Sequence, residues 1–340
     1  MTVSKPWVRR LDIDRSQLIR RSIQAAFFLL NLWVGVQFYL FVRRFEGGGG
    51  LVVSRPAGVE GWLPIAGMMN TKYFVLTGEV PAMHPAAMFL FLTFVALSLF
   101  LRKAFCGWLC PVGSLSEYLW KFGRKTFRRN FAPPRRLDVA LRGLKYVLLG
   151  LFLYAVGSMS ADAIAGFLES PYGYVADVKM LNFFRHMSTA AAWVVGGLLV
   201  ASIFVRNFWC RYLCPYGALM GLAALLSPLR IRRVPEACID CAKCAKACPS
   251  LLPVDHLLQI RSAECLGCME CVAVCPAEGA LHLSLLSPKR KIQPWAVAAA
   301  ICVVFAGVVT LAKATGHWES PITDQIYQVL IPRVGDFAHP

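Results

Sequence analysis

The sequence predicts an α-helical integral membrane protein with a small cysteine-rich module of mixed α and β structure near its C-terminal end. Of its 340 residues, 57% are hydrophobic and only 16% are charged, a balance too apolar for a soluble domain. Long apolar stretches recur along the chain, and two regular runs account for most of its 13 cysteines.

Five apolar stretches are candidate transmembrane helices. They are Ser22–Val42, Met83–Leu101, Leu144–Ser160, Thr189–Phe204 and Trp295–Leu311. Because a helix needs about 20 residues to cross the hydrocarbon core, the flanks of the shorter stretches should complete their spans. We therefore expect about five transmembrane helices.

The basic residues predict how the chain is oriented. With a cytosolic N-terminus, residues 1–21, 102–145 and 205–293 lie in the cytosol and hold 28 of the 36 lysines and arginines, as the positive-inside rule requires. Topology and anionic lipid then account for the net charge of +17, and no nucleic-acid motif accompanies it. We predict a multi-pass protein of a bacterial inner membrane with a periplasmic C-terminal tail and no nucleic-acid partner.

The two cysteine runs share one spacing. They are Cys238-x₂-Cys241-x₂-Cys244-x₃-Cys248-Pro249 and Cys265-x₂-Cys268-x₂-Cys271-x₃-Cys275-Pro276. This is the spacing of bacterial two-cluster ferredoxins, in which the fourth thiolate of each run binds the other cluster. The runs therefore predict two [4Fe–4S] clusters in a cytosolic module, one held by Cys238, Cys241, Cys244 and Cys275 and the other by Cys265, Cys268, Cys271 and Cys248.

Structural zinc and disulfides fit these runs less well. Zinc sites pair two cysteines and, after a spacer, two more, while disulfides need an oxidising compartment. The short alternating segments Ile231–Pro235 and Ala280–Leu285 flank the runs and predict a pair of ferredoxin strands. A short helix is expected within Pro249–Glu264.

A second cysteine motif occurs twice. The segment Phe105–Leu115 (FCGWLCPVGSL) aligns with Trp209–Leu219 (WCRYLCPYGAL), each at the cytosolic end of an even-numbered span. The two membrane halves are therefore predicted to be parallel hairpin repeats, related by an axis along the membrane normal.

These motif cysteines are candidates for a third site. Cysteines four apart on a helix share one face, so symmetric packing of the repeats would bring four thiols together. They are Cys106, Cys110, Cys210 and Cys214. Four thiolates suffice for a third iron–sulfur cluster. Buried packing thiols or a redox-active dithiol are the alternatives.

The exterior side offers weaker candidates. His84 and His186 occupy comparable positions in the two repeats and could ligate a haem, or one could accept a proton from quinol. An ordinary place at a helix end explains both histidines more simply, so we do not assign haem. A possible quinone site would lie near His84, with four further polar residues, Glu60, Lys72, Tyr73 and Glu79.

The paired motifs followed by two ferredoxin runs resemble the membrane polyferredoxins over roughly residues 20–285. These include the NapH-type subunit of periplasmic nitrate reductase systems and the iron–sulfur half of NosR-type proteins, with CcoG-type proteins more distant. The exterior segment Arg55-Pro56-x₂-Val59-Glu60-Gly61-x-Leu63-Pro64-Ile65, followed by Lys72-Tyr73, also resembles one found in some of them. This chain differs from NosR-type proteins in lacking a flavin domain before its membrane part and in having a fifth span.

The resemblance implies an electron-transfer function. Electrons would pass between the quinone pool or cytosolic donors and periplasmic partners such as a reductase, a flavoprotein or a cytochrome c. The chain would be an electron-transfer subunit, in one direction a quinol dehydrogenase component, rather than a stand-alone enzyme. The competing hypothesis is an assembly or maturation factor that reduces a metal or thiol during biogenesis of another redox enzyme.

The predicted organisation has six parts. They are a cytosolic N-terminal segment (1–21), a first membrane hairpin (22–130), a second membrane hairpin (143–230), the ferredoxin domain (231–288), a C-terminal transmembrane helix (294–313) and an exterior tail (314–340).

Overall fold

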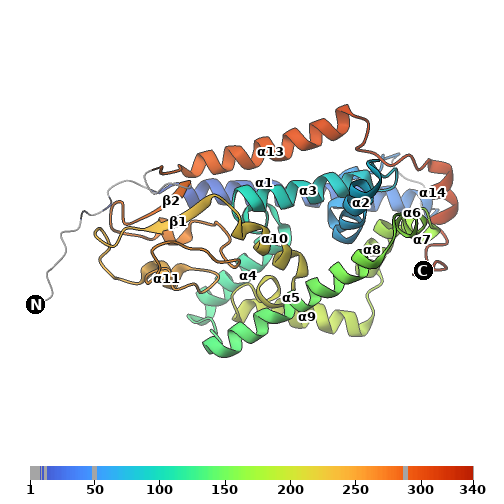
Figure 1. Ribbon diagram of the computed structural model, residues 1–340. Helices are drawn as coiled ribbons and strands as arrows, with labels where there is room; N and C mark the ends of the chain where they lie inside the picture. Colours follow the sequence, from blue (N-terminus) through green and yellow to red (C-terminus); the bar gives the residue numbers. More distant parts are fainter. Residues whose placement is uncertain (1–7, 9, 11–13, 48–51, 286–289, 340) are drawn as a thin grey trace, which may run out of the picture. The chain divides into compact units, whose positions relative to one another are not determined.

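The computed structural model describes residues 8, 10, 14–47, 52–285 and 290–339, which are mostly helical (Figure 1). Much of the predicted N-terminal segment and the end of the predicted ferredoxin domain lie outside these residues. The chain divides into two compact units. Unit 1 comprises Met1–Phe28, Phe94–Leu149 and Gly197–Val304, and unit 2 comprises Leu29–Thr93, Gly150–Gly196 and Phe305–Pro340.

Three helices are long and apolar enough to cross a membrane: α1 (Ser16–Phe45), α5 (Arg135–Ser158) and α13 (Pro294–Ala314). Helices α8 (Ala176–Arg185) and α9 (Thr189–Phe204) pass the same test together, but they are bent by 81° at their junction. By length and composition, the described residues therefore hold three candidate spans, or four if the bent pair is one span. The prediction of a helical membrane protein is confirmed, whereas a count of five spans is not.

The predicted second span is shorter than expected. Helix α3 covers Pro85–Phe100, 16 residues, against about 20 for a crossing. His84 immediately before it and Arg102 just after it have φ angles of 53° and 64°. Because the left-handed backbone region does not continue a right-handed helix, these residues limit α3 at both ends.

The sequence repeat has the same local structure in both copies. Helices α3 and α9, each of 16 residues, are followed by a five-residue π-helical turn and then by a helix that starts at a proline. The turns are η2 (Phe105–Leu109) and η3 (Trp209–Leu213), and the following helices are α4 (Pro111–Phe127) and α10 (Pro215–Leu225). These turns carry the motif cysteines and belong to unit 1.

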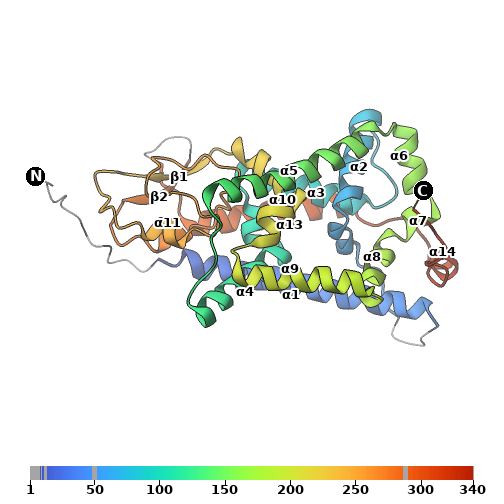
Figure 2. The same ribbon diagram turned by 90° about the horizontal axis from the view of Figure 1, so that it is seen from below.

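The ferredoxin part of unit 1 contains a two-stranded antiparallel sheet. Strand β1 (Leu229–Arg233) pairs with β2 (Leu281–Leu285), with Ile231 opposite Leu283 and both buried. The predicted strand pair is confirmed. In both Figure 1 and Figure 2 the two strands lie together with helix α11 (Lys243–Ala247).

The prediction of a short helix between the two cysteine runs is wrong. The short helices lie inside the runs instead, as α11 in the first and α12 (Glu270–Ala273) in the second. Pro249 and Pro253 each lack a backbone N–H, and the described chain between the runs forms turns and extended segments.

Unit 2 contains short helices around two apolar clusters. Its remaining elements are η1 (Ala57–Trp62), α2 (Pro64–Thr77), α6 (Ala161–Leu168), α7 (Pro171–Tyr174) and α14 (Asp324–Leu330). One cluster includes Phe41, Val59 and Val178, and Tyr327 of α14 packs into it. These contacts bring η1 and the start of α8 to the same core, which places their charged residues side by side.

Candidate iron–sulfur sites

The loops of the two ferredoxin runs have the same backbone shape. Asp240 and Ala242 in the first run have positive φ angles of 54°, and Gly267 and Met269, at the corresponding positions of the second, have 62° and 57°. Positive φ is uncommon outside glycine, so three non-glycine examples indicate a specific turn. Alternating left-handed and right-handed residues form the concave backbone nests found at many iron–sulfur sites.

Four cysteines from both runs line one pocket in unit 1. They are Cys248 from the first run and Cys265, Cys268 and Cys271 from the second. All four are buried, and Ile231, Val254 and Ile260 give the pocket an apolar lining. Burial raises the pKa of Cys268 to about 12, while the nearby charge of Arg20 lowers it. The structure thus gathers the set that the interchange of fourth cysteines predicts.

The other predicted set lies nearer the solvent. It consists of Cys238, Cys241, Cys244 and Cys275, of which Cys241 is exposed and the rest are partly buried. Burial raises the pKa of Cys275, and the charges of Cys241 and Cys238 raise it further. Burial likewise raises the pKa of Cys244 to about 11, with Cys275 adding to the effect. These mutual effects show that the four thiols are neighbours.

The cysteines of the repeat also converge. Burial raises the pKa of Cys106 to about 12, and the charges of Cys110 and Cys214 raise it further. Burial raises the pKa of Cys210 as well, and all three other thiols act on it in the same direction. These mutual effects place the four thiols near one another within unit 1.

The local geometry of each motif differs from the expected helix face. Cys110 has an extended backbone (φ −62°, ψ 118°) and caps α4, because the following proline disfavours the helical region. Its Sγ accepts a hydrogen bond from Gly113 N–H at 3.5 Å, and the Sγ of Cys214 accepts one from Gly217 N–H at 3.2 Å. The first cysteine of each motif lies in the π-helical turn, a feature frequent at functional sites.

Two buried lysines accompany the four thiols. Lys103 and Lys145 are 3% and 0% exposed, and the charges of both lower the pKa of Cys106. Lys145 binds both carboxylate oxygens of Glu264 at 2.7 Å. Iron binding requires thiolates, and buried cations offset that negative charge. The donors and charges of this site therefore fit an anionic iron–sulfur cluster.

The repeat cysteines lie against the second ferredoxin run. A Cβ atom added at Gly107, next to Cys106, would lie 2.5 Å from the carbonyl oxygen of Leu266, next to Cys265. Trp108 Nε1 donates to the carbonyl of Gly267 at 3.2 Å. The backbones that carry the two sets of thiols are therefore in direct contact.

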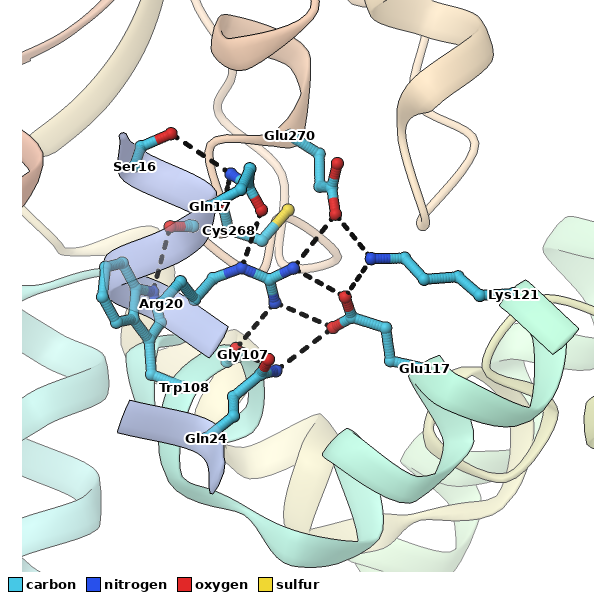
Figure 3. A network of polar contacts seen from close by, with 11 residues as sticks. Ser16, Gln17, Arg20, Gln24, Gly107, Trp108, Glu117, Lys121, Cys268 and Glu270 are labelled. Atoms are coloured by element: carbon cyan, nitrogen blue, oxygen red, sulfur yellow. Dashed lines mark hydrogen bonds and ion pairs between the residues drawn. The ribbon is translucent and has the colours of Figure 1, made fainter. Parts of the chain in front are cut away.

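A buried arginine of α1 joins the same two segments (Figure 3). Arg20 forms a bidentate pair with Glu117, at 2.8 and 2.6 Å, and also contacts Glu270 at 3.1 Å. Burial would raise the pKa of Glu117, but Arg20 and Lys121 lower it to about 2. Sequence reasoning missed this network. The signal in the sequence was Glu117, an acidic residue just after the first motif.

Within the described residues, no three His, Cys, Asp or Glu side chains converge closely enough to hold a single metal ion. A [4Fe–4S] cube, in contrast, binds each thiolate to a different iron. All three cysteine sets offer thiol donors for such cubes. The two sets from the ferredoxin runs also have the expected spacing, and the buried set shares one pocket. A bound cube supplies one-electron transfer. The chain supplies the thiolates, the backbone nests and the surrounding charges.

Unit 2 holds a second buried polar network. Arg55 contacts Glu60 at 2.8 Å and Asp177 at 2.7 Å, and both carboxylates are fully buried. His84 Nδ1 lies 3.3 Å from Glu60 Oε1, and its Nε2 lies 2.8 Å from the carbonyl oxygen of Gly173. Arg55 Nη2 also lies 3.5 Å from Nδ1, so this nitrogen can donate to Glu60 or accept from Arg55, depending on the tautomer.

Burial and the neighbouring groups act in opposite directions on His84. Burial would lower its pKa, but hydrogen bonding to Glu60 and the charges of Glu60 and Asp177 raise it, against a weaker opposing effect of Arg55. Burial would raise the pKa of Glu60, and Arg55 and His84 lower it. With His84 protonated, the network would hold two cations and two anions and be electrically balanced. The exterior segment noted in the sequence includes Arg55 and Glu60, but it does not include their partner Asp177.

This arrangement does not support haem ligation by the two histidines. Both ring nitrogens of His84 already have polar neighbours in the protein, and His186 is exposed. Nor does the structure assemble all five polar residues suggested for a quinone site. Lys72 donates to the carbonyls of residues 156, 157 and 159, and Glu79 is exposed.

Comparison with known protein families agrees with the cysteine sites. A family model described as a 4Fe-4S binding domain matches the chain twice, at residues 83–130 and 187–233. A 4Fe-4S dicluster domain matches residues 230–276. The first family thus covers both copies of the repeat motif, and the second covers both ferredoxin runs. No solved structure matches the chain.

Three relatives extend over larger parts of the chain. YccM of Escherichia coli (strain K12), whose name assigns it provisionally to electron transport, is 48% identical over 94% of this chain and 91% of its own length. Protein NirI of Paracoccus denitrificans is 33% identical over 62% of this chain and 30% of NirI. The ferredoxin-type protein NapH of Haemophilus influenzae is 27% identical over 51% of this chain and 59% of NapH.

The fold and the cysteine sites define a ferredoxin-type iron–sulfur protein with candidate membrane helices. Its class of function is iron–sulfur electron transfer. The chain belongs to the membrane polyferredoxin-type family that includes these relatives, which confirms the resemblance seen in the sequence.

Proposed function

We propose that this protein carries electrons through three [4Fe–4S] clusters held by its three cysteine sets. The observation that carries the proposal is the contact between Gly107 and Leu266 in unit 1. These residues directly follow Cys106 and Cys265, so the site formed by the repeat adjoins the buried ferredoxin site. A chain of one-electron carriers requires each site to lie close to the next one.

The remaining step leads to the exposed ferredoxin site. The charge of Cys244 acts on Cys271, which places a thiol of the outer set near one of the buried set. Cys241 of the outer set is exposed. The order is therefore repeat site, buried ferredoxin site, exposed ferredoxin site. We assign exchange with a soluble redox partner to the exposed end.

The chain's own residues bind the clusters and set their surroundings. Thiolates of the eight ferredoxin cysteines and of the four repeat cysteines hold iron, and the backbone nests turn those of the runs inward. Lys103 and Lys145 offset the negative charge at the repeat site. The apolar lining around Ile231 excludes water from the buried site.

The charge distribution supports a topology for this function. The basic segments 102–145 and 205–293 include all twelve cysteines of these sites, so we place the clusters on the cytosolic side of an inner membrane. In this proposal the two repeats are parallel hairpins, the flanks of α3 complete a further crossing, and the tail after α13 is periplasmic. Electrons pass between the quinone pool or cytosolic donors and a periplasmic redox system.

The first test counts the clusters. Anaerobically purified protein should contain about twelve irons and as many acid-labile sulfides per chain, and Cys106→Ala with Cys210→Ala should lower both to about eight. Reductive EPR on the same samples should show the loss of one signal. About eight irons in the unaltered protein, with no change in the variant, would leave the repeat cysteines as thiols without a cluster.

Turnover separates electron transfer from a role in assembly. An electron conduit should be reoxidised repeatedly by its acceptor in membranes, at enzymatic rates. An assembly or maturation factor should be needed only until its client enzyme is complete. Depleting the protein after the client has formed should therefore stop electron flow only in the first case.

A further inference from the structure

Arg20 is a fully buried cation whose hydrogen-bonding capacity is completely used. Its Nε donates to Gln17 at 3.1 Å, and its Nη1 donates to the Gly107 carbonyl at 3.1 Å and to Glu117. Its Nη2 donates to Glu117 and Glu270. All five guanidinium protons thus have acceptors, so the charge is held in one place.

That place lies between two of the proposed cluster sites. Gly107 follows Cys106 of the repeat site, and Gln17, which orients Arg20, donates to the carbonyl of Cys268 at 2.9 Å. Figure 3 shows the Cys268 side chain beside the Arg20 guanidinium. Arg20 therefore contacts the chain segments that carry both sets of thiols, within unit 1.

The acidic partners do not remove its influence. Glu117 and Glu270 each also bind Lys121, at 2.6 and 2.7 Å, so the four side chains carry no net charge together. A network without net charge still acts on a nearby group when its charges lie at different distances from that group, and Arg20 is the member beside Cys268. Reduction adds one negative charge to a cluster, and in a buried site a fixed positive charge nearby stabilises that charge strongly.

The structure assigns Arg20 the role of a positioning residue that raises the reduction potential of the cluster bound by Cys248, Cys265, Cys268 and Cys271. This role rests on the proposed function, because it requires clusters at these sites. Glu117 opposes Arg20 and lowers the same potential. The pair sets how readily the middle site of the chain accepts an electron.

The test is an anaerobic redox titration of the full-length protein in detergent, followed by EPR, with iron and sulfide measured on every sample. Arg20→Gln should lower the reduction potential of one cluster by at least 59 mV. For a one-electron couple, this shift changes the ratio of reduced to oxidised cluster tenfold. Glu117→Gln, nearly the same shape, should raise it. The affected signal should be the one that Cys268→Ser alters.

Two further variants separate charge from structure. Arg21→Gln removes the neighbouring arginine, which is exposed, and should leave every potential unchanged because solvent screens that charge. Arg20→Lys keeps the charge and should retain most of the potential. If Arg20→Gln loses iron, a rise in Glu117→Gln at full iron content, together with a nearly unchanged potential in Arg20→Lys, supports the role of Arg20, and no rise in Glu117→Gln overturns it.

Unchanged potentials in Arg20→Gln and Glu117→Gln at full iron content would overturn the role of Arg20. Shifts of the same sign in both would also overturn it. Absence of the two ferredoxin clusters from the unaltered protein would instead overturn the proposed function. The two failures are therefore distinguishable in one set of samples.

Discussion

Replacing Arg55 with methionine would leave two buried carboxylates of unit 2 without their shared guanidinium. Arg55 binds Glu60 at 2.8 Å and Asp177 at 2.7 Å, and both carboxylates are 0% exposed. The net charge of the network would fall by one in a site that water does not reach.

The structure sets the expected size of this effect. Removing one partner of a buried ion pair costs about 3–5 kcal/mol, mainly because the other charge stays buried and uncompensated. Each 1.4 kcal/mol is about tenfold in an equilibrium constant, so local opening should become at least about a hundredfold more frequent. Amide hydrogen exchange of peptides covering 171–185, measured by mass spectrometry, reports this opening.

The matched control removes a negative charge as well. Arg55→Met with Asp177→Asn removes one positive and one negative charge, so the net charge of the network is unchanged and the double variant should recover at least half of the lost stability. An acceleration below about tenfold in the single variant would refute the reasoning. So would a double variant that is less stable than the single one, because the cost would then arise from packing and not from charge.

Three further predictions concern pH, packing and ligation. The pKa of His84 is raised from its usual 6.5, so its contribution to stability is complete below pH 6.5 and is lost as pH rises through its folded value. The pKa of Glu60 is lowered from 4.5, so its contribution to stability is complete above pH 4.5 and is lost on further acidification. Unit 2 should therefore be most protected from amide exchange between pH 4.5 and pH 6.5. His84→Gln should reduce the loss of protection as pH rises above this range. Gly107→Ala should cost about 1–3 kcal/mol in thermal or chemical unfolding, because its Cβ would lie 2.5 Å from a backbone oxygen of Leu266, and an unchanged midpoint would contradict that contact. Cys241→Ala should abolish one cluster and destabilise the other ferredoxin cluster, and full iron content with two unchanged EPR signals would exclude this ligand assignment.

Much of the site could be predicted because the cysteines that bind a cluster are regularly spaced over a short stretch of the sequence. The intervals between Cys238, Cys241 and Cys244 identify the donors and the cluster type without any tertiary information. The alternating apolar residues of β1 and β2 likewise predicted the strand pair, whose register the structure supplies. The repeat at Cys106 and Cys210 suggested that the two motifs act together.

Helix lengths were less predictable. Apolar composition marked the segments of α3 and α9, but not the left-handed residues that limit α3 or the 81° bend before α9. Backbone conformation at a helix end depends on contacts outside the helix. A hydropathy pattern contains no record of those contacts.

The sequence by itself determined which residues could bind iron, that the chain is duplicated, and which segments are apolar enough for a membrane. Only the tertiary structure decided that Arg20 contacts both neighbouring cysteine segments and that Asp177 shares Arg55 with Glu60. The physical reason is the separation along the chain of the residues that produce each property. Ligand spacing and hydropathy are properties of neighbouring residues, whereas burial and charge pairing arise when segments more than a hundred residues apart pack together.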